Sequence, residues 1–173
     1  MKYRSIIISG PIASGTSTAA KAVAEKLNLP YHSAGDFFRQ YVIDHNIPLH
    51  DKAQIPDDIE QKIDEELTQK AKEGAVIDSH YAGYFNRDNE NVLKVLLTCD
   101  EDVRIKRALS RKHTHTETPE EIKKREEGLD KKFRKLYADE NYLDPKFFDL
   151  EIDTTNLPIE KTAEKIIEKF REV

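Results

Sequence analysis

The chain has 173 residues, of which 38% are hydrophobic and 35% charged, and this length suits one compact domain with a sizeable core. Its formal net charge of -5 argues against a general nucleic-acid binder. Its single cysteine, Cys99, excludes a disulfide framework and favours a reducing compartment.

The first elements along the chain are a short apolar strand and two amphipathic helices. Residues 6–8 are three isoleucines, a run typical of a buried parallel strand. After a loop at residues 10–15, apolar residues at helical spacing predict a helix that ends near Asn28. Ser33 is the expected N-cap of a second helix, which continues to about Ile43.

The middle of the chain returns to strands after one long helix. Residues 44–56 contain two prolines and predict a loop. Apolar residues between 59 and 71 recur at helical spacing, and Gly74 is expected to end that helix. Residues 75–77 and 92–98 are apolar runs that predict two further strands.

The last third repeats the alternation. Asp100 is expected to cap a helix, and residues 110–117 predict a loop. A capping box with proline at the first helical position, residues 118–121, begins the next helix. Residues 148–152 predict a strand, and Pro158 precedes a final amphipathic helix. Apolar strands that alternate with helices indicate an α/β fold with a parallel sheet covered by helices.

The strongest chemical signal lies between the first strand and the first helix. The segment has two glycines separated by four residues, followed by hydroxyl side chains, and comprises Gly10, Pro11, Ile12, Ala13, Ser14, Gly15, Thr16, Ser17 and Thr18. Glycines permit backbone angles that point successive N–H groups inward, and a helix N-terminus adds unsatisfied donors. The spacing predicts a phosphate-binding loop, and an ordinary tight strand-to-helix turn is the alternative.

One position of this loop departs from the standard pattern. Thr16 stands where that pattern has lysine, so the loop lacks a point charge for the outer phosphates. Ser17 keeps the hydroxyl expected to bind Mg²⁺.

Positive charge is concentrated in one segment. Residues 104–135 contain twelve Lys or Arg and six Asp or Glu, although the whole chain is acidic. This imbalance favours a local anion partner, and a solvated, salt-bridged helix pair explains the pattern equally well.

Several segments together resemble the archaeal type of cytidylate kinase, within the nucleoside monophosphate kinase family. The likeness covers nearly the whole chain and is carried by residues 10–18, 33–39, 78–84, 125–126 and 148–154, and by Arg104, Arg107, Arg111 and Tyr137. Three features depart from the family pattern. Ala13 replaces a glycine, His80 stands where the family usually has arginine, and the segment between Arg39 and Asp64 differs in length and content.

The resemblance implies a P-loop kinase fold: a mostly five-stranded parallel sheet with helices on both faces and a short lid. Residues 1–173 would form a single domain, with an NMP-binding segment at about 33–73 and the lid at about 107–130. The implied reaction transfers the terminal phosphoryl group of ATP, with Mg²⁺, to a nucleoside monophosphate, most readily CMP or dCMP.

We expect three groups of site residues. The phosphate loop would hold ATP, and Ser17 with Asp78, the latter through water, would hold Mg²⁺. The expected acceptor-binding residues are Ser33, Asp36, Arg39, Asp64 and His80. The expected catalytic residues are Arg107, Arg111, Arg125, Lys132 and Asp78. Guanidinium groups present a planar fork to phosphate, and the lid arginines could replace the missing loop lysine.

Two other functions fit the same residues. One is a P-loop kinase for a different acceptor, such as adenylate, a sugar acid or shikimate. The other is a non-catalytic nucleotide-binding or RNA-associated regulator, because the loop lacks its lysine. The expected partners are small-molecule nucleotides, with no nucleic acid and no membrane, for a monomer. The early apolar cluster at residues 6–8 is too short for a signal peptide or a membrane span, which favours a cytoplasmic location.

Overall fold

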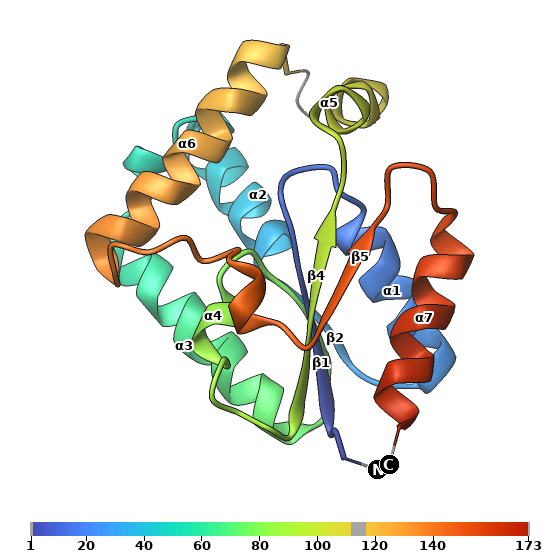
Figure 1. Ribbon diagram of the computed structural model, residues 1–173. Coiled ribbons are helices and arrows are strands. Elements are labelled where there is room, and N and C mark those ends of the chain that lie inside the picture. The colour runs from blue at the N-terminus through green and yellow to red at the C-terminus, as the bar shows by residue number, and fades with distance from the viewer. Residues whose placement is uncertain (1, 112–116, 173) are drawn as a thin grey trace.

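A five-stranded parallel sheet forms the centre of the protein, as the computed structural model of residues 2–111 and 117–172 shows (Figure 1). The spatial order is β2-β3-β1-β4-β5, and every neighbouring pair is parallel. The strands are β1 (Ser5–Ser9), β2 (Tyr31–Ser33), β3 (Val76–Asp78), β4 (Val92–Thr98) and β5 (Leu150–Asp153). The expected α/β fold class is therefore confirmed.

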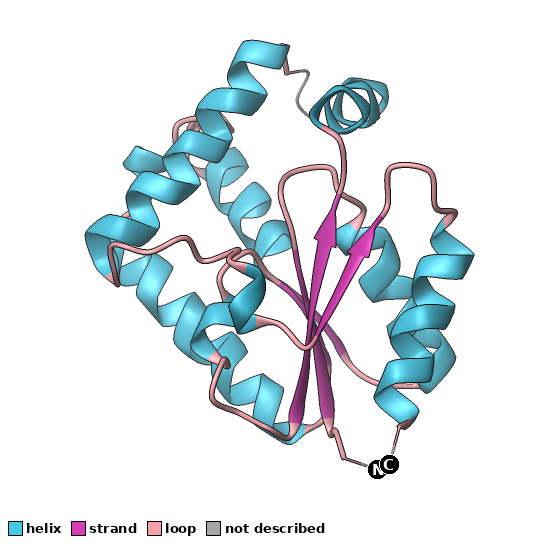
Figure 2. Cartoon of the chain, in the orientation of Figure 1, coloured by secondary structure: helices cyan, strands magenta, loops and turns pink. Residues whose placement is uncertain are grey.

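Helices cover both faces of this sheet (Figure 2). The α-helices are α1 (Thr16–Leu27), α2 (Ala34–Asp44), α3 (Asp57–Glu73), α4 (Ala82–Phe85), α5 (Glu101–Ser110), α6 (Pro119–Leu136) and α7 (Ile159–Arg171). Two 3₁₀ turns, η1 (Lys52–Gln54) and η2 (Pro145–Phe147), lie in the connections. Helices α1 and α7 pack together on one face, whereas α3 and α4 contact β1 from the other.

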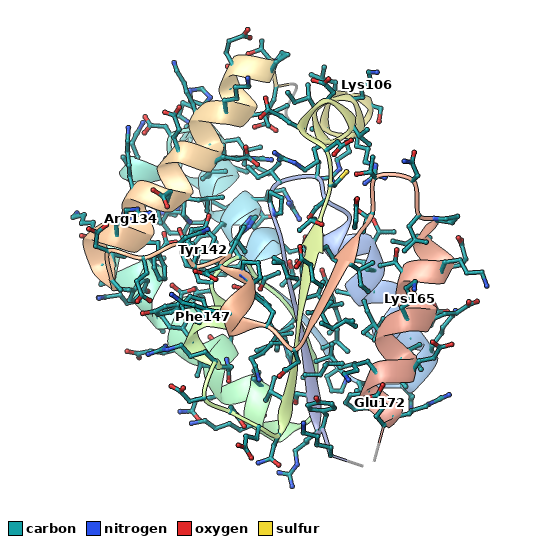
Figure 3. All side chains as sticks on the ribbon, viewed as in Figure 1. Lys106, Arg134, Tyr142, Phe147, Lys165 and Glu172 are labelled. Atoms are coloured by element: carbon teal, nitrogen blue, oxygen red, sulfur yellow. The ribbon has the colours of Figure 1, made fainter. Side chains whose placement is uncertain are left out.

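Alternating residues of the first strand serve the two faces. Ile6 and Ile8 pack in the core cluster with α1 and α7, and Ile7 packs in the cluster with α3. All three are fully buried, which explains why the strand has no polar face. The outer faces of the helices carry charged side chains, among them Lys106 and Lys165, which point away from the sheet (Figure 3).

The cap signals gave the most accurate boundaries. Ser33 Oγ accepts a hydrogen bond from the Asp36 amide and caps α2. Thr118 and Glu121 form the predicted capping box of α6. The periodicity missed β2, whose three residues are too few for a pattern, and the four-residue helix α4.

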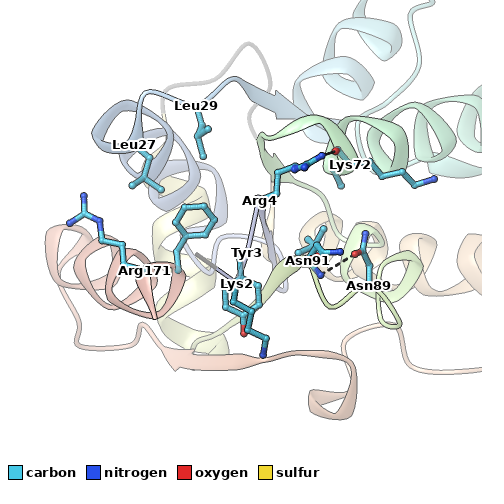
Figure 4. A pocket seen from close by; sticks show the side chains of 12 residues that line it. Lys2, Tyr3, Arg4, Leu27, Leu29, Lys72, Asn89, Asn91 and Arg171 are labelled. Carbon is cyan, nitrogen blue, oxygen red and sulfur yellow. Dashed lines mark hydrogen bonds between the residues drawn. The ribbon is translucent and has the colours of Figure 1, made fainter. Parts of the chain in front are cut away.

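The carboxyl ends of the strands and the chain termini lie at opposite edges of the sheet (Figure 1). An open pocket of about 730 Å³ lies near the termini, and Tyr3, Leu29 and Asn91 are among its lining residues (Figure 4). The carboxyl edge carries the phosphate loop and the polar side chains that follow β2 and β3. Of the helices described, none is long and apolar enough to cross a membrane.

Candidate active site

The loop between β1 and α1 has a conformation that depends on its small residues. Gly15, the N-cap of α1, has a φ of 98°, in the left-handed region where glycine carries no steric cost. Ala13 is also left-handed, with a φ of 62°, at the position where the family pattern has glycine. A Cβ on Gly10 would lie 2.5 Å from Leu97 O and from Ser14 Oγ, so this position excludes larger residues.

The loop also contains an unsatisfied polar atom. Ser14 Oγ is buried and has no hydrogen-bond partner among the residues that the structure describes. Buried polar groups of native proteins nearly always have partners, so an unpartnered hydroxyl at the start of a helix is consistent with an absent ligand. The adjacent N-terminus of α1 favours a negatively charged one.

Asp78 lies at the centre of a hydroxyl cluster at the end of β3. The strand register places it beside Ile8 of β1 and Ser33 of β2. Ser17 Oγ donates to Asp78 Oδ2 at 2.6 Å, and the Tyr31 hydroxyl donates to the same oxygen at 3.2 Å. Burial raises the pKa of the Asp78 carboxyl, and the hydrogen bonds from these hydroxyl groups oppose that rise.

A cavity of about 120 Å³ joins the phosphate loop to the segment around α2 and α3. Ten of the sequence-predicted residues line it: Ile12, Ala13, Thr16, Ser17, Arg39, Asp64, Asp78, His80, Arg111 and Arg125. They come from the loop, from α2, α3 and α6, and from the ends of β3 and α5. The fold therefore brings together residues that lie more than one hundred positions apart in the sequence.

Three arginines face this cavity. Arg125 pairs with Glu117 at 3.2 Å, and Arg39 pairs with Asp36, whereas Arg111 has no ion pair within the described residues. Partial burial lowers the pKa of Arg111, and the neighbouring positive charge of Arg39 lowers it further. Positive side chains that lie close together repel one another, and a bound anion offsets this repulsion. Three guanidinium groups therefore match a ligand with several phosphate groups.

Known proteins resemble this chain in sequence. A family model described as an AAA domain matches residues 6–130. A cytidylate kinase of Sulfolobus acidocaldarius is 36% identical over 94% of this chain and 91% of its own. That of Sulfurisphaera tokodaii is 34% identical over 95% of this chain and 93% of its own. The chain belongs to the cytidylate kinase family.

Solved structures show the same fold at lower sequence identity. A shikimate kinase from Bacteroides thetaiotaomicron superposes with a TM-score of 0.62 and 17% identity, covering 97% of this chain and 98% of its own. A gluconokinase from Sinorhizobium meliloti gives a TM-score of 0.63 at 17% identity, covering 98% of this chain and 93% of its own. The P-loop kinase fold is thus shared by kinases whose names indicate different acceptors.

His80, which departs from the cytidylate kinase pattern, is held against the phosphate loop. Its Nδ1 lies 2.9 Å from Gly10 O, so the ring donates Nδ1–H to that carbonyl. Burial lowers the pKa of His80 to about 4, and the nearby charge of Lys52 contributes to this lowering. The imidazole is therefore neutral at neutral pH and does not supply the positive charge of the family arginine.

Two of the expected catalytic residues lie outside the cavity lining. The Arg107 guanidinium donates to Thr154 O at 2.7 Å and holds α5 against the segment after β5. Lys132 Nζ donates to Ile55 O at 2.6 Å and lies 2.7 Å from Asp57 Oδ1, joining α6 to the start of α3. Arg107 of α5 and Lys132 of α6 thus have hydrogen-bond partners in other parts of the domain.

Two of the expected acceptor residues also serve local structure. Ser33 caps α2 and donates to Asp78 Oδ2 at 3.4 Å, and Asp36 is the ion-pair partner of Arg39. Neither is among the residues that line the cavity. Asp36 acts on the cavity through Arg39, whose side chain it orients.

The structure adds functional candidates that sequence reasoning missed. Arg104 Nη1 donates to Ile12 O at 2.9 Å and pairs with Glu126, so it supports the phosphate loop from outside the cavity. Lys52 and Glu60 line the cavity, and Lys52 Nζ lies 2.6 Å from Glu60 Oε1.

The sequence contains a signal for Glu60. Glu60 and Asp64 lie one helical turn apart on α3, on the face that carries the buried residues Leu67 and Ala71. Charged residues at core positions of a helix are rarely buried without a partner or a function. The same reasoning offers no signal for Lys52, which lies in a stretch without periodicity.

Proposed function

We propose that this protein transfers the terminal phosphoryl group of ATP to CMP or dCMP, giving ADP and the cytidine diphosphate. The observation that carries the proposal is the convergence of Arg39, Arg111 and Arg125 on a cavity that also contains the phosphate loop. The names of the curated relatives support a cytidine monophosphate as the acceptor.

The donor site is proposed to be the phosphate loop, residues 10–18. Its backbone N–H groups, together with the free Ser14 hydroxyl, would bind the phosphates of ATP. Ser17 and Asp78 supply neighbouring oxygen ligands, which suit Mg²⁺. Bound Mg²⁺ would neutralise charge on the terminal phosphates. The described residues contain no group of three or more His, Cys, Asp or Glu that could hold a metal, which fits an ion that takes most of its ligands from phosphate and water.

The transfer needs little covalent chemistry from the protein. An oxygen of the acceptor phosphate forms a bond to the terminal phosphorus of ATP, and the bond to the bridging oxygen breaks with release of ADP. Arg39 is proposed to bind the acceptor phosphate. Arg111 and Arg125 are proposed to stabilise the charge of the phosphoryl group in transit, in place of the lysine absent at Thr16.

The proposed organisation is a single domain with an acceptor-binding segment at about residues 33–73 and a lid at about 107–130, acting as a cytoplasmic monomer. The exclusion of bulk water by this lid would protect ATP from hydrolysis. Arg107 and Lys132 are reassigned as residues that position α5 and α6, because their contacts lie outside the cavity.

The test is ADP formation from ATP and Mg²⁺ with CMP, dCMP, UMP, AMP and GMP in separate reactions. Preferred turnover of CMP or dCMP supports the proposal. Preferred turnover of another monophosphate would support the proposed type of reaction but show that the acceptor is not CMP or dCMP. ATP binding without turnover of any monophosphate would overturn the proposed function.

A further inference from the structure

The wall of the cavity formed by η1 and α3 carries three ionisable side chains that phosphoryl transfer does not require. Lys52, Glu60 and Asp64 are 7%, 0% and 5% exposed, respectively. Burial of charge costs folding free energy unless the charges are paired and hydrogen-bonded. Three such groups at one wall therefore need an explanation.

Their pairing within the protein is incomplete. Lys52 Nζ lies 2.6 Å from Glu60 Oε1, and the Tyr137 hydroxyl donates to Asp64 Oδ2 at 2.6 Å. Glu60 Oε2 is fully buried and has no hydrogen-bond partner in the described part of the chain. A buried acceptor without a partner, on a residue that lines a cavity, indicates a donor group on the ligand.

Apolar side chains line the same cavity. They come from α2, from α6 and from the segment around η1, and they are Phe38, Val42, Leu49, Ile55 and Leu129. Lys52 Nζ lies 4.0 Å from the centroid of the Phe38 ring, so the ammonium group lies over the face of an aromatic side chain. Apolar walls with a few convergent polar groups suit a flat ring that has polar atoms along one edge.

We propose that Lys52, Glu60 and Asp64 read the acceptor base and set a preference for CMP over UMP; this inference rests on the proposed function. The amino group of cytosine has two hydrogens, and the wall offers two carboxylates one helical turn apart. The ring nitrogen N3 next to that amino group and the carbonyl oxygen beyond it are acceptors, which match the donors of Lys52. Uracil has a carbonyl oxygen in place of the amino group and an N3–H donor in place of the ring acceptor, so it would set an acceptor against the carboxylates and a donor against Lys52.

Two variants test this reading. Glu60→Gln alone keeps the side-chain shape but leaves Lys52 as an unpaired buried charge, so loss of folding would not be informative. The double variant Lys52→Met with Glu60→Gln removes both charges together, a change that buried ion pairs often tolerate. Binding of CMP and of UMP to wild type and to the double variant is measured by titration calorimetry, alongside turnover of each.

We expect wild type to bind CMP more tightly than UMP. In the double variant CMP affinity should fall on the order of 10- to 100-fold, as for lost hydrogen bonds to charged groups. The affinity for UMP should change much less, so the ratio of CMP affinity to UMP affinity should fall. An equal loss for both nucleotides, or an unchanged preference, would overturn the inference.

The matched control is an ion pair elsewhere in the protein, of which the lysine is buried and the aspartate is exposed. Lys94 is 3% exposed, and its Nζ lies 2.9 Å from Asp149 Oδ2, on a strand outside the cavity lining. The variant Lys94→Met with Asp149→Asn should keep the preference of wild type. Suppose that wild type binds CMP selectively without phosphorylating it, while the double variant loses part of its preference for CMP over UMP. That result would overturn the proposed function and support the inference about base recognition. CMP turnover with an unaltered preference would do the reverse.

Discussion

Ser17 and Asp78 are 61 residues apart in the sequence, yet the hydroxyl of Ser17 donates to Asp78 Oδ2 at 2.6 Å. The parallel pairing of β1 with β3 produces this contact, because it places the end of β3 beside the loop that leads into α1. The two residue types are those through which P-loop enzymes hold Mg²⁺ next to the phosphates. The contact therefore joins the phosphate loop to the carboxyl end of β3.

Ser17→Ala is expected to lower kcat/KM on the order of 100-fold and to raise the Mg²⁺ concentration needed for half-maximal rate. The hydroxyl is only half-buried, so the unfolding temperature should change little. The measurement is the initial rate of ADP formation at varied Mg²⁺. Ser5→Ala is the control, because Ser5 accepts from the Ala75 amide at the other end of β1. It should lower stability without changing the Mg²⁺ dependence, and an equal Mg²⁺ dependence in Ser17→Ala would contradict the assignment.

Arg111→Ala is expected to lower kcat on the order of 100- to 1000-fold, because it removes a positive charge that we propose stabilises the phosphoryl group in transit. If the arginine compensates for the missing lysine, Thr16→Lys should restore part of the rate in the Arg111→Ala background. Steady-state kinetics of the single and double variants give the answer. Lys106→Ala, which removes an exposed charge from the same helix, should leave kcat unchanged. Unchanged turnover in Arg111→Ala would exclude this arginine from the transfer.

The local signals of the sequence predicted much of the fold. The isoleucine run, the cap at Ser33 and the capping box at Thr118 each depend on neighbouring residues, so they were readable without tertiary structure. The strand β2 has three half-buried residues, and its identity as a strand comes from pairing with β3. Such an element has no periodicity of its own to read.

The residues of the candidate site also fall into those that local sequence predicts and those whose role depends on tertiary contacts. The phosphate loop was predicted because its function depends on adjacent glycines and hydroxyl groups. The partners of Arg107 and Lys132 are carbonyls of Thr154 and Ile55, which only the folded chain brings near. Charge and helical position alone could not separate these two residues from Arg111, because all three are basic residues in the same stretch of sequence.

Lys132→Met is expected to lower the free energy of unfolding by about 1 to 3 kcal/mol, because it leaves the buried carbonyl of Ile55 without its donor, whereas Asp57 keeps Lys135 as a partner. The value of kcat for CMP should stay within about threefold of wild type, because Lys132 lies outside the cavity lining. Urea unfolding and initial rates measure the two quantities. A large fall in kcat with unchanged stability would restore the catalytic assignment.

Asp64 should make the stability of the protein depend on pH. Burial raises the pKa of its carboxyl from 3.8 to about 7, although the hydrogen bond from Tyr137 opposes that rise. Between these values the folded state binds a proton that the unfolded state has lost, so this group lowers stability as pH rises from about 4 to about 7. The full change is on the order of 4 kcal/mol. Asp64→Asn removes the titration and keeps an acceptor for Tyr137.

The free energy of unfolding of Asp64→Asn, relative to wild type, is therefore expected to increase from pH 4 to pH 7 and to level off above that range. Urea unfolding of both proteins without nucleotide, at intervals of one pH unit, measures this difference directly. Gln61→Asn on the exposed side of the same helix removes no titrating group, so it is the control and should give a nearly constant difference. A constant difference for Asp64→Asn as well would mean that folding does not raise the pKa of the Asp64 carboxyl. In that case the carboxylate would already be charged at neutral pH, and the rise that we attribute to its burial would be absent.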